Sequence, residues 1–329
     1  MPDNSLGFKI NLGDKSLPAY RGKINVYNDL LMDSTGLYIS GNVEYKTTML
    51  FSDKIRFFPD SLSGSLDKGF VYEGQYNNDK FKYPPLELTG LDFTYFNLND
   101  DYLYFKYDSS MNTKVYAYEK AVEIFGDLII SPQDVTSEGD IKTNNSYFSS
   151  DNFSFSEDYL ISENTDVKLN HYNHNSGLLN SEGVFFKYDI QKNEMDFKFN
   201  FFDEKNFVLP HYKVSTSLSY ATWLINENQI QLSAKSDENH YFYPYEDKFN
   251  NWNFSASGAY LDLNSARLSI EGIPELQVAD AYIIPKKGNI VISEEFNISP
   301  LNEAELILDT INEYHNFTNS DIIIKSKNK

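Results

Sequence analysis

The sequence predicts an all-β protein, an elongated stack of short antiparallel strands built from repeats, with little helix. First, apolar and aromatic runs of about four to eight residues, such as Tyr102–Tyr107, Val122–Ile130 and Met195–Phe201, alternate with clusters of Asn, Asp, Ser and Gly, as strands alternate with turns. Second, 25 Tyr and 25 Phe in 329 residues supply ample packing material for a folded core. Third, part of the sequence is repeated.

The repeat becomes visible when the sequence is shifted by 98 residues, which aligns two segments without a gap. One block aligns Ile24, Val26, Tyr27, Asp29, Leu30 and Leu31 with Val122, Ile124, Phe125, Asp127, Leu128 and Ile129. Another aligns Gly41, Val43, Ser52, Asp53, Ile55 and Phe57 with Gly139, Ile141, Ser150, Asp151, Phe153 and Phe155. A weaker third copy begins at Trp223. Since one hairpin buries too little apolar surface to be stable alone, we expect stacked copies that share a core, with Gly41 and Gly139 at sharp bends.

The domain organisation follows from these copies. We expect a first β unit over residues 1–120, a second over 121–218 and a third, degenerate unit over 219–329. The third unit is expected to hold a short helix near 299–314, because Ser299 and Pro300 suit a helix start. Apolar residues follow at helical spacing: Leu301, Ala304, Leu306 and Leu308.

Composition excludes several classes of function. Lys plus Arg number 28 against 48 Asp plus Glu, a formal net charge of −20, so a nucleic-acid backbone would be repelled. The absence of Cys excludes disulfides, thiolate metal sites and Cys nucleophiles. No apolar run approaches the roughly 18 to 20 residues of a membrane-spanning helix. Met1–Ala19 lacks a signal-peptide pattern, so we expect either a cytosolic chain or an excised piece of a longer one.

Motifs of classical enzymes are missing. The sequence holds no Gly-rich phosphate loop, no Gly-x-Ser-x-Gly elbow and no His-Glu-x-x-His pair. His171 and His174 would point to opposite faces of a strand, and the acidic runs at 99–101 and 294–295 lack the spacing of a calcium loop. We therefore predict a protein that is not an enzyme, with no catalytic residue, no metal site and no cofactor.

The motif over Leu30–Phe57 resembles the OstA-like family of lipopolysaccharide-transport proteins in the periplasm of Gram-negative bacteria. The resemblance rests on an apolar strand, a Gly-Asn-Val corner and a returning strand with Ser, Asp and an aromatic residue: Leu37, Ile39, Ser40, Gly41, Asn42, Val43, Ser52, Asp53, Ile55, Arg56 and Phe57. Similar stretches occur in very long envelope proteins of these bacteria. The segments Val122–Phe155, Trp223–Ala234 and Ala266–Ile292 carry the same theme, although Asp140 follows Gly139 and Ala234 replaces the glycine.

The resemblance implies an open β-jellyroll or β-solenoid in the periplasm or at the outer membrane, with the export signal absent from this chain. Its apolar interior would bind acyl chains or lipopolysaccharide, and its open strand edges would bind another envelope protein. The expected lipid-lining residues are Val43, Ile55, Phe57, Ile141, Phe153 and Phe155. The expected assembly edge is Ile322, Ile323 and Ile324.

Two rival functions stay open. A carbohydrate-binding or adhesin-like module would use the aromatic clusters of 241–245 with Trp252, or of Tyr95–Tyr107. It predicts aromatic side chains lined up on one outer face and no internal groove. A polysaccharide-degrading β-helix or sandwich enzyme would instead show a wide groove with convergent carboxylates.

Overall fold

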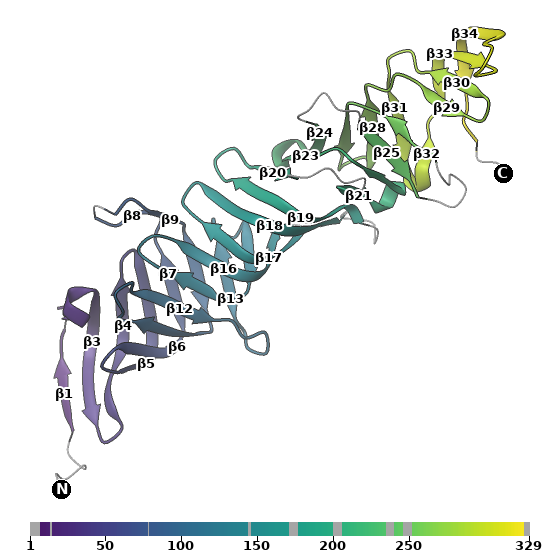
Figure 1. The fold of residues 1–329 in the computed structure, drawn as a ribbon. Coiled ribbons are helices and arrows are strands. Elements are labelled where there is room, and N and C mark those ends of the chain that lie inside the picture. Colours follow the sequence, from purple (N-terminus) through teal and green to yellow (C-terminus); the bar gives the residue numbers. More distant parts are fainter. Residues whose placement is uncertain are drawn as a thin grey trace. The chain divides into compact units, whose positions relative to one another are not determined.

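A computed structural model describes residues 7–13, 15–77, 79–143, 146–170, 177–199, 206–234, 240–245 and 252–325 (Figure 1). Within these ranges the regular structure is β-strand, interrupted by short 3-10 turns, and the strand pairs described below are antiparallel. The predicted all-β class is therefore confirmed. The chain forms two compact units, Met1–Ser162 and Glu163–Lys329, and both expected domain boundaries, after residues 120 and 218, fall inside these units.

Unit 1 begins with the hairpin strands that precede its main ladders. They are β1 (Phe8–Asn11), β2 (Leu17–Ala19), the turn η1 (Tyr20–Gly22), β3 (Ile24–Asp33), β4 (Gly36–Tyr45) and β5 (Thr48–Phe57). The ladders contain β6 (Ser61–Leu66), β7 (Lys68–Val71), β10 (Leu86–Thr89), β11 (Leu91–Phe96), β12 (Tyr102–Lys106), β13 (Lys114–Ala117), β14 (Val122–Phe125) and β15 (Leu128–Ile130). The remaining strands are β8 (Gly74–Gln75), β9 (Lys82–Tyr83), β16 (Val135–Thr143) and β17 (Ser146–Phe155), while β18 (Tyr159–Asn170) runs across the unit boundary.

The main ladders of unit 1 form a closed ring of strand pairs. The first half of β5, Thr48–Phe51, pairs with β7, and its second half, Ile55–Phe57, pairs with β6. One ladder continues from β7 through β10, β13 and β14, and the other from β6 through β11, β12 and β15. Both ladders end on β16, whose halves pair with β14 and β15. Unit 1 thus has two forks, one at β5 and one at β16.

The core of unit 1 lies inside this ring. Alternate residues of each strand face inward, and cross-strand register aligns them in rows. One row contains Ile39, Ile55, Gly64, Phe93, Phe105, Leu128, Ser137 and Phe153. Phe93, Phe105 and Phe153 are at most 1% exposed, and each such side chain stabilises the fold by about 1.5–3 kcal/mol through burial.

The predicted repeat has the same strand register in both copies. Val26 pairs with Val43 as Ile124 pairs with Ile141. In both copies a β-bulge follows, after which Gly41 pairs with Ser52 and Gly139 with Ser150. A Cβ atom on either glycine would lie 2.6 Å from a backbone carbonyl oxygen of the neighbouring strand, that of Tyr27 or of Phe125. Glycine is needed there because no side chain fits at the bend.

The third copy differs from the first two in strand register. Leu224 pairs with Gln229, whereas the aligned Leu31 pairs with Tyr38. The segment between the paired residues is therefore two residues shorter in the third copy, so this copy shares the hairpin theme but not the register of the first two copies.

Unit 2 has a fork of its own at β19 (Gly177–Asp189). Asn180 pairs with Val208 of one ladder, and the segment after Gly183 pairs with β20 of the other. The first ladder holds β21 (Phe207–Leu209), β22 (Val214–Thr216), β25 (Tyr241–Pro244) and β26 (Phe254–Ser255). The second holds β20 (Glu194–Lys198), β23 (Tyr220–Leu224), β24 (Gln229–Ser233), β27 (Gly258–Asp262), β28 (Arg267–Glu271), β31 (Ile290–Ser293) and β32 (Asn297–Ile298). The turns η2 (Pro210–Tyr212), η3 (Ile225–Glu227) and η5 (Glu294–Phe296) separate strands of this unit.

The helix predicted near 299–314 is wrong. A separate sheet contains β29 (Leu276–Val278), β30 (Ala281–Ile284), β33 (Leu301–Leu308) and β34 (His315–Ile322), and β33 pairs with both β30 and β34. The register of β33 shifts between Leu301 and Ala304, and Glu303 has a φ of 55°. A bulge of this kind interrupts the two-residue alternation, and so it spaces two buried residues, Leu301 and Ala304, as a helix would.

Candidate functional site

The six residues predicted to line a lipid groove lie in or beside the core of unit 1. Five of them, namely Val43, Ile55, Ile141, Phe153 and Phe155, are fully buried. The sixth, Phe57, is partly exposed and stacks on Tyr20 with ring centroids 6.2 Å apart. None of the six lines any of the three surface hollows described below. Acyl-chain binding by these residues stays a prediction.

Buried tyrosines add to this packing and bond to turns at strand ends. Tyr45 donates a hydrogen bond of 3.0 Å to the carbonyl oxygen of Asp101, and Tyr83 donates one of 3.0 Å to that of Ser131. Burial raises the pKa of both hydroxyl groups above the usual value of tyrosine. The Asp101 carboxylate lies 3.1 Å from Lys23 Nζ and accepts a hydrogen bond of 3.4 Å from Tyr95. The hydroxyl groups of Tyr45, Tyr83 and Tyr95 in unit 1 are thus satisfied although their rings are buried.

The predicted assembly edge lies at the end of the separate sheet in unit 2. Ile322 is the last residue of β34 and pairs with Leu301. Ile323 follows with 61% of its surface exposed, and Ile324 is partly exposed. Phe317 on the same strand is 48% exposed. These residues are accessible, and the assembly role stays a prediction.

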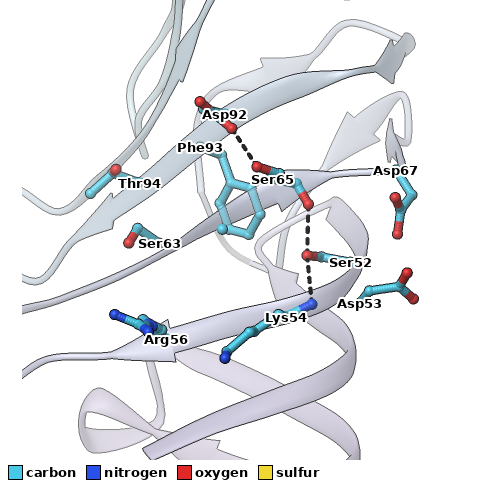
Figure 2. Close-up of a pocket in the computed structure, with 11 residues that line it drawn as sticks. Ser52, Asp53, Lys54, Arg56, Ser63, Ser65, Asp67, Asp92, Phe93 and Thr94 are labelled. Atoms are coloured by element: carbon cyan, nitrogen blue, oxygen red, sulfur yellow. Dashed lines mark hydrogen bonds between the residues drawn. The ribbon is translucent and has the colours of Figure 1, made fainter. Parts of the chain in front are cut away.

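The first hollow lies at the β5 fork and has a volume of about 580 Å³ (Figure 2). It exists because Ser52–Lys54 pair with neither β6 nor β7, so the two ladders separate there. The Ser52 hydroxyl spans the gap, since Oγ donates to the carbonyl oxygen of Ser65 at 2.7 Å and accepts from the amide nitrogen of Lys54 at 3.3 Å. The other residues that line it are Asp53, Arg56, Ser63, Gly64, Asp67, Asp92, Phe93 and Thr94.

Charges of the two signs are separated within this hollow, which we call the fork hollow. Figure 2 shows Arg56, Ser63 and Thr94 at one end and Asp53 with Asp67 at the other. The remaining carboxylate is held in place, because Ser65 Oγ donates to Asp92 Oδ1 at 2.6 Å. The hollow can therefore bind a ligand that carries a negative group at one end and hydrogen-bond donors at the other.

The second hollow, of about 280 Å³, lies over β7, β10 and β13 and is lined by aromatic rings and carboxylates. Register places Phe70, Glu87 and Tyr116 in one row. Tyr72 is 59% exposed and stacks on Phe70 with ring centroids 6.3 Å apart. Lys120 Nζ lies 3.3 Å from the Glu87 carboxylate and 5.8 Å from the centre of the Tyr116 ring. We call this the aromatic hollow.

The third hollow, of about 1040 Å³, lies at the turns that end β5 and β11. Tyr20 forms part of its wall and donates hydrogen bonds to the carbonyl oxygens of Phe58 and Ser61. The other residues of its wall are Arg21, Lys23, Pro59, Asn97, Leu98, Asn99, Asp100 and Tyr102. Backbone angles in the left-handed region at Tyr20 and Arg21 form the tight turn beside it.

The aromatic clusters singled out in the sequence contribute mainly to packing. Phe242 is fully buried and stacks on Phe254 with ring centroids 5.7 Å apart. Trp252 packs 5.7 Å from Phe296, and its indole nitrogen donates to the carbonyl oxygen of Gln277 at 2.6 Å. In the other cluster Tyr95 is buried. Tyr245 of the first cluster is 44% exposed, and a further row of partly exposed rings, Phe70 and Tyr116, lies on β7 and β13.

The described residues contain neither a metal-binding cluster nor a membrane-spanning helix. Among the residues that the structure describes, no three His, Asp or Glu side chains are grouped so that they could hold a metal ion. His171 and His174 lie outside the described ranges. Within those ranges, no helical segment has the length and hydrophobicity needed to cross a bilayer.

Comparison with known proteins gives no further guide to the site, because the chain matches no family model, no curated protein and no solved structure.

Sequence reasoning missed both small hollows for the same reason. Arg56 and Asp53 belong to the motif of Leu30–Phe57, but Asp67, between β6 and β7, and Asp92, on β11, meet them only through the fork. Phe70, Tyr72 and Tyr116 are far apart in the sequence or lie within short runs. The local signal for the aromatic hollow is a charged and an aromatic residue on the outer face of each short strand, Lys68 with Phe70 in β7 and Lys114 with Tyr116 in β13.

Proposed function

We propose that this chain is a non-enzymatic β-repeat protein that binds carbohydrate on an outer face of unit 1. The observation that carries the proposal is the aromatic hollow, where rings and carboxylates share one exposed surface. The apolar face of a sugar ring stacks on an aromatic side chain, while its hydroxyl groups donate hydrogen bonds to carboxylates.

The spacing within the hollow supports this use. Phe70 and Tyr116 occupy the two outer strands of the row, with Glu87 on the strand between them. Because paired strands lie about 4.8 Å apart, the two rings are separated by about twice that distance, with a carboxylate midway. The exposed ring of Tyr72 extends the platform beyond Phe70. One or two sugar units fit such a surface.

A glycan-array screen followed by calorimetry with the best neutral oligosaccharide tests the proposal. We expect Tyr72→Ala and Tyr116→Ala each to weaken binding about three- to tenfold, since aromatic contacts contribute about 0.5–1.5 kcal/mol beyond burial. Tyr147→Ala is the matched control, because Tyr147 is an exposed tyrosine on β17 that does not line the hollow. Equal losses in all three variants, or no binding by the wild type, would refute carbohydrate binding at this face.

Acyl-chain or lipopolysaccharide binding is the second candidate, and one observation favours it. The inner rows between the ladders are almost wholly apolar from β5 to β17, as in the row of Ile55, Phe93 and Phe153. Since these side chains fill the space themselves, the ladders would have to separate to admit a lipid. Lipid that stays bound in native mass spectrometry of the purified chain, and that is lost in Phe155→Asp with the fold retained, would favour this function over the first.

The proposal extends to where the protein acts. A non-enzymatic scaffold in the envelope of a Gram-negative bacterium, associated with the periplasm or the outer membrane, fits the resemblance of the Leu30–Phe57 motif. Its protein partner would pair with the exposed strand end at Ile322–Ile324. Fractionation of cells that express the full-length protein tests the location, and a cytosolic pool would contradict it.

A further inference from the structure

The fork hollow contains an arginine without an internal partner. The sequence has three arginines, Arg21, Arg56 and Arg267. Arg56 is exposed at the hollow, and among the described residues its guanidinium group forms no hydrogen bond or ion pair. Its neighbour Lys54 is engaged differently, because the Lys54 ammonium group lies 4.7 Å from the centre of the Tyr38 ring. In a protein with a net charge of −20, a guanidinium left unneutralised is available to a ligand.

Two hydroxyl groups continue the row that begins at Arg56. Arg56 pairs with Ser63, and Ser63 pairs with Thr94, so the three side chains stand on neighbouring strands and face the same side. Among the described residues, neither hydroxyl group has a hydrogen-bond partner within the protein. Arginine offers a planar pair of donors that matches a carboxylate. The hydroxyl groups of Ser63 and Thr94 can then form hydrogen bonds with the rest of the ligand that carries this carboxylate.

The carboxylates of the hollow restrict where a negative group can bind. Asp53 and Asp67 lie at the end away from Arg56 (Figure 2), where they would repel a second negative group but accept hydrogen bonds from sugar hydroxyls. The volume of about 580 Å³ lies within the range of small-ligand sites. A ligand that satisfies both ends carries one carboxylate and, beside it, a neutral polyhydroxyl unit.

We propose that the fork hollow binds one acidic sugar of a saccharide in which uronic acid and neutral sugars alternate, with Arg56 as the carboxylate-binding residue. The proposal rests on the carbohydrate-binding function above but uses a different surface of unit 1. Ser63 and Thr94 bond to the acidic sugar, and Asp53 with Asp67 accept from the hydroxyls of its neutral neighbour. A run of consecutive uronic acids binds more weakly, because its second carboxylate meets the two aspartates.

Calorimetry on the full chain tests this assignment with a uronic acid–hexose disaccharide, a diuronic acid and a neutral disaccharide. We expect the mixed disaccharide to bind best and Arg56→Gln to weaken it at least about tenfold, as loss of a charge-assisted bidentate contact does. Arg56→Lys should give a smaller loss. Lys106→Gln is the matched control, because it removes a positive charge from β12, next to Asp92 of the hollow, without touching the lining. Its binding should change less than about twofold.

Several outcomes would overturn the proposal or separate it from the proposed function. Equal losses in Arg56→Gln and Lys106→Gln, or stronger binding of the diuronic acid, would overturn it. Binding of sodium phosphate or of vesicles with anionic lipid that depends on Arg56, without saccharide binding, would assign the hollow to another ligand class and also overturn it. In another outcome, the wild type binds no neutral glycan and still binds the mixed disaccharide in a way that depends on Arg56. That result would refute carbohydrate binding at the aromatic hollow and support the fork hollow. Thermal unfolding checks that each variant is folded.

Discussion

The two forks of unit 1, at β5 and at β16, share one feature of their strand connections and differ in what that feature contacts. At both forks an aspartate lies in the short connection between the separating strands, Asp67 between β6 and β7 and Asp127 between β14 and β15. The Asp127 carboxylate accepts a hydrogen bond of 2.8 Å from the Tyr107 amide nitrogen and another from the Tyr104 hydroxyl. Asp67 instead borders the fork hollow. The comparison teaches that register fixes the shape of both forks, whereas the neighbouring side chains decide which one stays open.

The largest loss of stability is expected when the bend glycines, Gly41 and Gly139, are replaced. A Cβ at Gly41 or Gly139 would approach a backbone carbonyl oxygen to 2.6 Å, and both residues have positive φ angles. We expect Gly41→Val and Gly139→Val each to lower the free energy of unfolding by about 3 kcal/mol or more, as measured by urea denaturation. Gly13→Val is the control for backbone strain alone, because Gly13 also has a positive φ, at 57°, while nothing lies within 4 Å of its Cβ position; its loss should be smaller than the loss at Gly41 or Gly139. Losses that differ widely between Gly41 and Gly139 would show that the two copies are not equivalent.

The next largest effect is a difference in stability between substitutions of the two fork aspartates. We expect Asp127→Ala to cost about 1.5–3 kcal/mol, because the Tyr107 amide and the Tyr104 hydroxyl lose a charged acceptor. Asp67→Ala should stay within about 0.5 kcal/mol, since an exposed side chain away from such bonds contributes little. The same urea titrations measure both values. A cost for Asp67→Ala as large as that for Asp127→Ala would mean that the β5 fork is also closed in solution.

The stability contributed by the β16 fork, where Asp127 is hydrogen-bonded, should also depend on alkaline pH. The hydrogen bond to Asp127 raises the pKa of Tyr104 to about 12, from an ordinary tyrosine value of 10.0. Between these two values the unfolded chain has lost the proton and the folded chain retains it, so stability is complete below pH 10 and falls as pH rises toward 12. Tyrosinate absorbance measures the ionisation directly. In Asp127→Asn the pKa of Tyr104 should fall, and an unchanged titration would show that this bond is not its cause.

The sequence predicted the parts of this fold that depend on local pattern. Alternation identified the strands, and the match of Gly41 and Val43 with Gly139 and Ile141 anticipated a shared register. It failed where a bulge imitated helical spacing, between Leu301 and Ala304. The aromatic hollow combines β7, β10 and β13 through long-range strand pairing, and the fork hollow depends on which half of β5 pairs with which ladder. No local pattern encodes that choice.

The smallest effect concerns the serines that follow the two glycines in register. Ser52 and Ser150 each accept a hydrogen bond from the amide two residues later, at 3.3 and 3.1 Å. Ser52 also donates to the carbonyl oxygen of Ser65, whereas Ser150 shares its second bond with the Ser162 hydroxyl. We expect Ser52→Ala to cost about 1 kcal/mol and Ser150→Ala about half of that, because water replaces the second bond more readily at Ser150, the more exposed of the two. Chemical denaturation of both variants measures the difference. A larger loss for Ser150→Ala would mean that the serine hydroxyl contributes more to stability beside the β16 fork than at the β5 fork.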